Sequence, residues 1–528
     1  MTNSTSGVSQ SGTAGSSGIM ATSGEKPANM PEKIISEQLQ DNLDYLEMTF
    51  SKSTDIVFRH WNYGPELKFT ACSVFYESLV QEDTVNYMKI SLQDLATHEI
   101  GPGMDVTPQD IRSFFEHDGV SAKKPIILND LEMVVNEISN GRLLILFDQW
   151  NKALSFKAES VETRQVNESV NESVVQGPRE STVENLQKNL GLLRLRLKTP
   201  KFKLERITAG GETQTTVVYG YIEDAVDAEV LAEFEKRLEQ IKDVEILETS
   251  YIEQLIEDST YSPFPQHRYT ERTDMAVAGL LAGKIVVLSQ GTGGILICPG
   301  LFTEFFQSSE DYYQRTLIAT LVRWLRIVAF LIALILPSVY IALSTFHPEL
   351  IPTVLLLAVL NAREGIPLPA FFEALLMEFF FELMREAGVR LPRPVGSAVS
   401  IVGALVIGDA AISAGIASPI MVIVVALTGI ASFAIPQYNI AISLRILRFP
   451  LMVSAALLGG FGMMICLLFL LLHLCKLRSL GQPYLAPLAP FRLVELRDVI
   501  MRAPLKTLLR SPRNNHKHKP LYNGKNED

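Results

Sequence analysis

Hydrophobic residues are distributed so unevenly along this 528-residue chain that they divide it into two parts. Residues 1–310 mix short apolar stretches with polar and charged positions, which is typical of soluble modules. Residues 325–475 are dominated by long runs without charge. The twenty uncharged residues 327–346 would cover about 30 Å as a helix, which is the thickness of a bilayer core. The pattern therefore predicts a soluble region followed by a membrane region.

The periodicity of the first part changes repeatedly between helix and strand. Apolar residues follow helical spacing over 32–50 and again over 227–242. β-Branched and aromatic residues concentrate over 67–76, 203–207 and 215–221, which predicts strands, the last two paired as a hairpin. The predicted fold is therefore α+β (mixed α/β) in two soluble modules, followed by an all-α, multi-span transmembrane domain.

Composition places the boundaries between these parts. The first residues are rich in Ser, Gly and Thr and lack the basic start and apolar core of a signal peptide, so we expect a disordered leader. The expected units are a leader at 1–31, an N-terminal α/β module at 32–160, a linker at 161–180, a second α/β module at 181–310, a transmembrane helical domain at 320–475 and a basic cytoplasmic tail at 476–528.

Four membrane spans are predicted within the helical domain. They lie near 327–346, 396–416, 420–441 and 450–472. Apolar residues over 350–392 are interrupted by glutamates, which predicts re-entrant or interfacial helices there. An even number of spans places both ends on one side, and the basic residues outside the first and last spans place that side in the cytoplasm. Arg445 and Arg448 then fall on the far side, against the positive-inside rule.

Charge and cysteine usage narrow the class of partner. The net charge is −11, which argues against nucleic acid as a partner. After Leu474, however, eleven Lys and Arg stand against four acidic residues, so anionic lipid headgroups are the expected partner of the tail. The four cysteines are scattered and form no CxxC or His/Cys cluster, which predicts neither a metal site nor a disulfide framework.

No motif in the sequence predicts catalysis. The segment 279–285 resembles a phosphate-binding loop, but its glycine spacing is one residue short and Ile285 stands where a Ser or Thr must reach magnesium. The sequence contains no Gly-x-Ser-x-Gly elbow, and its histidines do not follow metal-ligand spacings. We therefore expect a protein that is not an enzyme and that holds no cofactor.

Glutamates in the predicted membrane region are candidates for an ion path. Glu378, Glu382 and Glu386 are four residues apart, so they share one face of a helix and repel one another. In a ring of subunits such a face would attract cations, as acidic rings do in cation channels. The alternative is the solvated face of a surface helix, with Arg385 and Arg390 compensating the charge.

Asp409 is a further candidate for the ion path, because it is the only charge between Arg393 and Arg445. Small residues beside it permit close helix packing, which suits a functional or inter-subunit role. The alternatives are a position near the membrane surface or a protonated, hydrogen-bonded carboxyl. Pro337 and Pro436 lie inside apolar runs and predict kinks, which are static in most helices but act as gates in some.

The second module and the helical domain also carry a specific set of short strings. They are Gln176-Gly-Pro-Arg-Glu180, Ser262-Pro-Phe-Pro-Gln266, Thr270-Glu-Arg-Thr-Asp274, Arg363-Glu364-Gly-Ile-Pro-Leu-Pro369, Arg385-Glu-Ala-Gly-Val-Arg-Leu-Pro392, Ser400–Gly408, Ala431–Pro436 and Arg445-x-x-Arg448-Phe449. Taken jointly, the strings resemble the signature of GerA-family A subunits, from about Glu32 to Pro504. Two positions depart from the family pattern: Thr273 replaces a proline, and Asp409 replaces a neutral Gln.

The resemblance implies a subunit of a nutrient germinant receptor in the spore inner membrane that triggers spore germination. Its implied partners are a B-type transporter-like subunit that binds the germinant, a C-type lipoprotein subunit and further copies of itself in a ring. On activation the ring would conduct monovalent cations. Arg363, Glu364 and Arg385, with the two prolines, are candidate structural or gating residues. The alternatives are a secondary transporter with its own substrate site and a non-conducting scaffold subunit.

Overall fold

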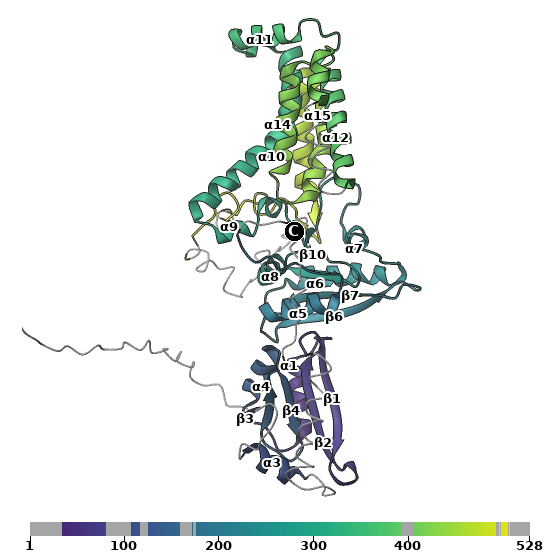
Figure 1. Ribbon diagram of the computed structural model, residues 1–528, viewed down its shortest axis with the longest axis vertical. Coiled ribbons are helices and arrows are strands. Elements are labelled where there is room, and N and C mark those ends of the chain that lie inside the picture. The colour runs from purple at the N-terminus through teal and green to yellow at the C-terminus, as the bar shows by residue number, and fades with distance from the viewer. Residues whose placement is uncertain are drawn as a thin grey trace, which may run out of the picture.

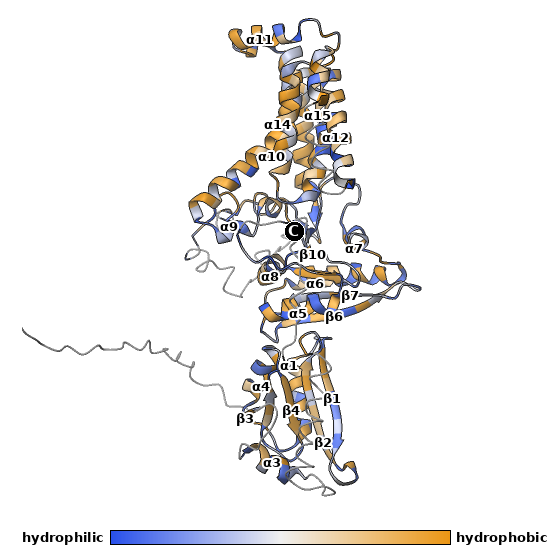
Figure 2. Ribbon diagram, viewed as in Figure 1, coloured by the Kyte–Doolittle hydropathy of each residue, from blue (hydrophilic) through white to orange (hydrophobic). Residues whose placement is uncertain are grey.

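The computed structural model describes residues 34–80, 107–116, 125–158, 172, 176–391, 403, 406–492, 496, 498–504 and 506. The predicted leader, most of the predicted linker and much of the predicted tail lie outside the described residues. Two α/β modules and a bundle of helices follow one another along the long axis of the molecule (Figure 1). Apolar residues dominate the helical bundle, whereas they alternate with polar ones in the two modules (Figure 2).

The first module is a five-stranded antiparallel sheet with helices on both faces. Its strands are β1 (Ile56–Tyr63), β2 (Phe69–Tyr76), β3 (Ile126–Leu128), β4 (Leu143–Phe147) and β5 (Ala153–Phe156), in the order β1-β2-β4-β5-β3. Alternate residues of β4 point to opposite faces. Leu144 and Leu146 pack with α1 (Leu39–Thr49) and α4 (Leu131–Ser139). Ile145 and Phe147 pack with α3 (Pro108–Glu116).

The second module repeats this topology. Its strands are β6 (Phe202–Ala209), β7 (Thr215–Ile222), β8 (Arg268–Thr270), β9 (Ile285–Ser289) and β10 (Ile295–Cys298), in the order β6-β7-β9-β10-β8. Helices α5 (Leu186–Arg196) and α8 (Thr273–Leu281) cover one face; α6 (Ala228–Leu238), η4 (Glu239–Asp243) and α7 (Thr249–Ile256) cover the other. Both modules thus place their strands in the same sequential order, and the predicted mixed α/β fold of this region is confirmed.

A buried ion pair joins the two modules. Arg194 of α5 donates from Nε and Nη2 to the carboxylate of Asp55, at 2.9 and 2.8 Å, and from Nη1 to the carbonyl of Phe202 at 2.8 Å. Its guanidinium lies 4.3 Å from the ring centre of Tyr76 and 4.7 Å from that of Phe202. Asp55 and Tyr76 belong to the first module, so one side chain of the second module ties the two together.

The helical region follows a short connection through η5 (Phe302–Phe306) and α9 (Glu310–Tyr313). It comprises α10 (Thr316–Thr345), η6 (Pro348–Leu350), α11 (Thr353–Arg363), α12 (Ala370–Arg390), a helix at 406–413, α14 (Pro419–Phe433) and α15 (Tyr438–Lys476), and ends in the short strands β11 (Arg478–Ser479) and β12 (Gln482–Pro483). α10, α12, α14 and α15 lie side by side, whereas α11 lies across the far end of the bundle (Figure 1). The predicted helical domain is therefore confirmed.

Helix α15 is a hairpin of two arms rather than one straight rod. Ser443 donates to the carbonyl of Pro263, while His473 Nε2 lies 2.9 Å from Oγ of the adjacent Ser262. A straight helix would separate residues 443 and 473 by about 45 Å. Gly459, with φ of 61°, interrupts the helical backbone between them. The chain therefore reverses at Gly459 and gives arms at 438–458 and 460–476.

The helices have other boundaries than two of the predicted spans, whose place in a membrane stays a prediction. The interval 420–441 contains a break over 434–437, because the turn residues Ile435 and Pro436 separate α14 from α15. The interval 450–472 contains the reversal at Gly459, since glycine adopts a positive φ at little cost. Among the described helices, α10 and α15 are long and apolar enough to cross a membrane, and α11 and α14 are shorter apolar helices.

Candidate functional site

A buried ion pair of the bundle joins α12 to the first arm of α15. Arg448 Nη1 contacts the Glu378 carboxylate, and the side chains of the two residues are 2% and 0% exposed. Arg448 lies ten residues from the start of α15, about 15 Å along the helix and midway along the first arm. Arg448 therefore lies inside a helix, where the carboxylate balances its charge; its place on the far side of the membrane stays a prediction.

Arg448 also contacts a further helix of the bundle, α10. Its Nε donates to the carbonyl of Ala333 in α10 at 3.1 Å. In a regular helix that carbonyl accepts from the amide four residues later, but residue 337 is proline and has no N–H. Pro337, predicted from the sequence as a kink or gating position, thus leaves an acceptor that the guanidinium satisfies. One side chain of α15 thereby contacts both α10 and α12.

The glutamate face of α12 becomes more exposed along the helix. Glu378 is fully buried, the side chain of Glu382 is 27% exposed and that of Glu386 is 64% exposed. Glu382 contacts Arg385 one turn away and Arg445 of α15, the latter at 3.4 Å. Glu386 pairs with Arg390 at 2.7 Å. The structure therefore brings the three predicted glutamates onto one face, each with an arginine partner.

One carboxylate oxygen of this face lacks a partner. Oε1 of Glu378 is buried and accepts no hydrogen bond from any residue that the structure describes. A buried polar atom without a partner is costly, and such atoms are uncommon in folded proteins. The Glu378 site therefore has one oxygen held by Arg448 and one oxygen open to a further donor or cation.

A second buried carboxylate ties α12 to the start of α14. Glu373 Oε1 lies 3.0 Å from Nη2 of Arg363, and Glu373 Oε2 accepts from the backbone amide of Ser418 at 3.0 Å. This assigns Arg363, one of the predicted structural residues, to the connection between α11 and α12. Glu364 is exposed beside it, on a cleft of about 520 Å³ formed with Leu360 and Asn361.

Two predicted residues lie apart from the glutamate face. Asp409 is exposed on the helix at 406–413, and its side chain makes no hydrogen bond or ion pair with any other described residue. Its assignment to an ion path stays a prediction. Pro436 lies in the turn between α14 and α15, so the kink expected there is wrong: the proline stands outside both helices.

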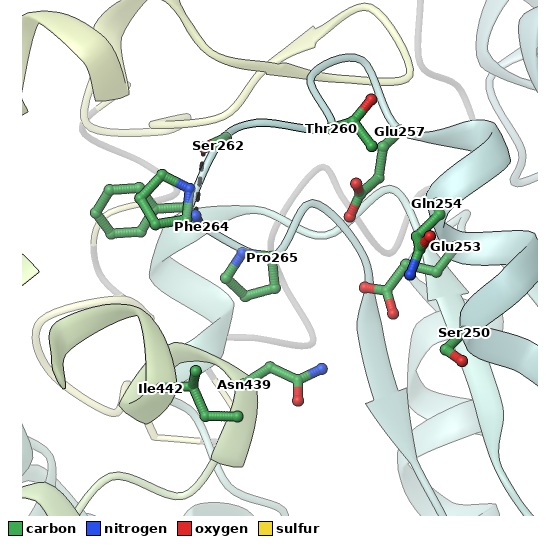
Figure 3. Close-up of a pocket in the computed structure, with 11 residues that line it drawn as sticks. Ser250, Glu253, Gln254, Glu257, Thr260, Ser262, Phe264, Pro265, Asn439 and Ile442 are labelled. Carbon is green, nitrogen blue, oxygen red and sulfur yellow. Dashed lines mark hydrogen bonds between the residues drawn. The ribbon is translucent and has the colours of Figure 1, made fainter. Parts of the chain in front are cut away.

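A cleft of about 440 Å³ opens where the second module meets the helical bundle (Figure 3). Glu253 lies on α7 and Glu257 follows its last residue. Both side chains point into the cleft, opposite Pro265 and Asn439. Burial, with the neighbouring Glu257 and Glu248, raises the pKa of Glu253 to about 8. Burial likewise raises the pKa of Glu257 to about 7. These carboxyls therefore change charge near neutral pH at the junction of the two regions.

The base of α10 is fixed by charges that sequence reasoning did not single out. Arg323 and Arg326 both contact Asp311 of α9, at 3.2 and 2.8 Å. Asp498 lies 3.6 Å from Arg323 and joins the segment after α15 to the same cluster. The sequence signal for this cluster is the pair of arginines before an apolar run, a pattern that by itself indicates only membrane orientation.

The chain is similar to known proteins over most of its length. Residues 44–514 match the family described as Bacillus/Clostridium GerA spore germination protein. The chain is 42% identical over 483 residues to an uncharacterized membrane protein, YfkQ, of Bacillus subtilis (strain 168), covering 91% of this chain and 92% of that protein. It is 40% identical over 494 residues to spore germination protein KA of the same organism, covering 94% and 90%.

Two further proteins are similar over shorter stretches. Spore germination protein GerLA of Bacillus cereus is 40% identical over 379 residues, covering 72% of this chain and 77% of that protein. The N-terminal domain of the A subunit of the Bacillus megaterium spore germinant receptor GerK3 is 27% identical, with a TM-score of 0.40, covering 52% of this chain and 99% of that one. The resemblance found in the sequence is confirmed, and the chain belongs to the GerA family of spore germination proteins.

Proposed function

We propose that this chain is the A-type subunit of a nutrient germinant receptor in the spore inner membrane, where it oligomerises and conducts monovalent cations when the receptor is activated. The observation that carries the proposal is the glutamate face of α12, with Glu378 fully buried inside an apolar bundle. Ionisable groups at such depth are costly and usually face protein or water on a transport path. Acidic faces of this kind attract cations when subunits surround an axis.

The arrangement of the bundle supports a multi-pass domain with both ends in the cytoplasm. Within the described residues, six helical segments run along it: α10, α12, the helix at 406–413, α14 and the two arms of α15. An even number of crossings returns the chain to the side from which it entered. Arg323 and Arg326 at the base of α10 favour the cytoplasm as that side.

Family membership supports the proposed partners. A B-type transporter-like subunit would bind the germinant, a C-type lipoprotein would complete the receptor, and copies of this chain would form the ring. The two α/β modules, tied together through Arg194, offer a rigid surface for these contacts. In this account the protein performs no catalysis; the binding energy of the germinant is used to change the arrangement of helices.

The test is K⁺ flux from liposomes that contain the full-length chain with its receptor partners, recorded as amino acids and sugars are added. We expect Glu382→Gln to reduce the activated flux at least about tenfold, because it removes a half-buried charge from the path. Glu386→Gln, the same change at the exposed end of the same face, is the matched control and should leave most of the flux.

Three outcomes would contradict the proposal. Activated flux that Glu382→Gln leaves unchanged would remove the glutamate face from the path. Absence of flux in receptors that bind germinant would favour a scaffold subunit. Accumulation of labelled amino acid or sugar inside the liposomes, coupled to the ion gradient, would favour a secondary transporter.

A further inference from the structure

We propose that Arg448 is a tethered cation that occupies a monovalent-cation site in the bundle, so that the site opens only when this arginine withdraws. The inference rests on the proposed function and deepens it, because it assigns the resting block of the ion path. It is carried by three observations: the set of oxygen atoms around the guanidinium, the open oxygen of Glu378, and the charge of the neighbouring side chains.

The first observation is that the atoms around Arg448 are oxygen atoms of the kind that coordinate a cation. They are a carboxylate oxygen of Glu378 and the carbonyl oxygen of Ala333, which Pro337 leaves without its usual amide. Carboxylate and backbone carbonyl oxygens are the groups with which channels replace the water around a passing cation. The guanidinium therefore satisfies the atoms that K⁺ or Na⁺ would use in its place.

The second observation is Oε1 of Glu378, which is buried and unpartnered among the described residues. Arg448 leaves this oxygen without a hydrogen bond, although the residue is 0% exposed. Were Arg448 the structural partner alone, a two-point contact like that of Arg194 with Asp55 would satisfy both oxygens. The site thus has the capacity for one more ligand than the arginine supplies.

The third observation is the balance of charge around the site. Glu378 and Glu382 face three guanidiniums, those of Arg385, Arg445 and Arg448. This group carries a net charge of +1 and repels cations in a low-dielectric interior. Withdrawal of Arg448 would leave the group neutral and expose the Glu378 carboxylate, so a cation could enter.

The site also connects the helices that would have to move. Arg448 is on the first arm of α15, whose start lines the cleft between the bundle and the second module. A rotation of this arm that originates at the module would carry Arg448 away from α10 and α12. Such helix shifts are a common way for a contact at one end of a packed element to alter another.

The test compares Arg448→Gln with Arg390→Gln in the full-length chain reconstituted in liposomes without germinant. Both variants remove one arginine from a glutamate pair of the same bundle, but the Arg390 pair is exposed. Two readouts are taken: K⁺ efflux, and labelling by a water-soluble cationic thiol reagent of an Ala333→Cys side chain in a background with Cys466 and Cys475 replaced. We expect Arg448→Gln to raise both at least about tenfold and Arg390→Gln to change neither.

The two readouts separate the inference from the proposed function. Labelling that stays at the wild-type level in Arg448→Gln overturns the inference, whether or not K⁺ flows. Raised labelling without K⁺ efflux supports the occupation of the site by Arg448 in the wild type and contradicts the channel function.

Arg448→Lys provides the test if the glutamine variant fails to fold. Lysine donates from a single atom, whereas Arg448 donates from Nε and Nη1 to two helices. We expect intermediate labelling and efflux, and wild-type values of both would overturn the inference.

Discussion

Two buried arginine–carboxylate pairs connect distant parts of this molecule, and they are built differently. Arg194 and Asp55 meet through two hydrogen bonds; Arg194 donates a third to the carbonyl of Phe202 and lies close to the rings of Tyr76 and Phe202. Arg448 and Glu378 meet through one guanidinium nitrogen and one oxygen, and the other oxygen is unpartnered in the described part of the chain. Both pairs are fully buried, so burial alone does not reveal which pair is a fixed joint.

The difference lies in how completely each charge is satisfied. Burial lowers the pKa of Arg194, but the adjacent Asp55 more than offsets this effect, so the pKa is raised overall and the arginine stays charged. Each of the three guanidinium nitrogens donates a hydrogen bond, which suits a permanent connection between the two modules. Around Arg448 an oxygen remains open, which suits a connection that gives way to another cation.

The largest expected effect is on the fixed joint. Arg194→Gln leaves the Asp55 carboxylate buried without its partner, which we expect to lower the free energy of unfolding of the modules by about 3–5 kcal/mol. Urea unfolding followed by the fluorescence of Trp61 and Trp150, in a Trp324→Phe background, measures it. Lys201→Gln removes an exposed ion pair of the same module and is the control. A loss below about 1 kcal/mol would contradict a fixed joint.

A smaller effect is expected from the carboxyls between the two regions. The pKa of Glu253 rises from its ordinary 4.5 to about 8 in the folded protein, mainly through burial. The corresponding stability is present below pH 4.5 and is lost as the pH rises through 8. Glu253→Gln should therefore raise the free energy of unfolding at pH 9 by roughly 2 kcal/mol and change it little at pH 4.

The melting temperature measured across this pH range checks that prediction. The wild type should lose stability as the pH rises from about 4.5 to 8, whereas Glu253→Gln should lose much less. Parallel profiles for the two proteins would show that the cleft solvates Glu253 in both charge states. The cleft would then not link the charge of this carboxyl to the contact between the second module and α15.

The smallest effect is expected at the exposed end of the glutamate face. Glu386 and Arg390 are 64% and 77% exposed, and exposed pairs one helical turn apart contribute at most about 0.5 kcal/mol. Glu386→Gln should change thermal stability in detergent by less than that amount. A loss of several kcal/mol would mean that Glu386 is buried against another subunit, and the graded exposure along α12 would belong to the isolated chain alone.

Local patterns in the sequence predicted much of the fold. The β-branched and aromatic residues over 67–76 predicted the strand β2, and the uncharged run before Phe346 predicted α10. The reversal of α15 was not foreseen, because Gly459 and Gly460 stand inside an unbroken apolar run. Glycine within such a run is equally compatible with close helix packing, so the run alone does not indicate a turn.

The sequence predicted the glutamates of the candidate site but not their partners. The spacing of Glu378, Glu382 and Glu386 gave their shared face, since that follows from helix periodicity. Their partners come from α15, with Arg448 separated from Glu378 by 70 residues, and no local pattern predicts which distant charge meets which. The sequence likewise does not predict that Arg448 bonds the carbonyl left free by Pro337, because this contact depends on the register of two packed helices.

The most direct measurement of the central claim is basal K⁺ efflux per folded molecule, with Arg448→Gln and Arg194→Gln compared side by side in liposomes. We predict that Arg448→Gln raises efflux at least about tenfold over the wild type, while Arg194→Gln lowers the yield of folded protein and leaves efflux per molecule unchanged. Equal efflux from the two variants, whether both raised or both at the wild-type level, would contradict the account, because the two buried arginines would then have no separate roles.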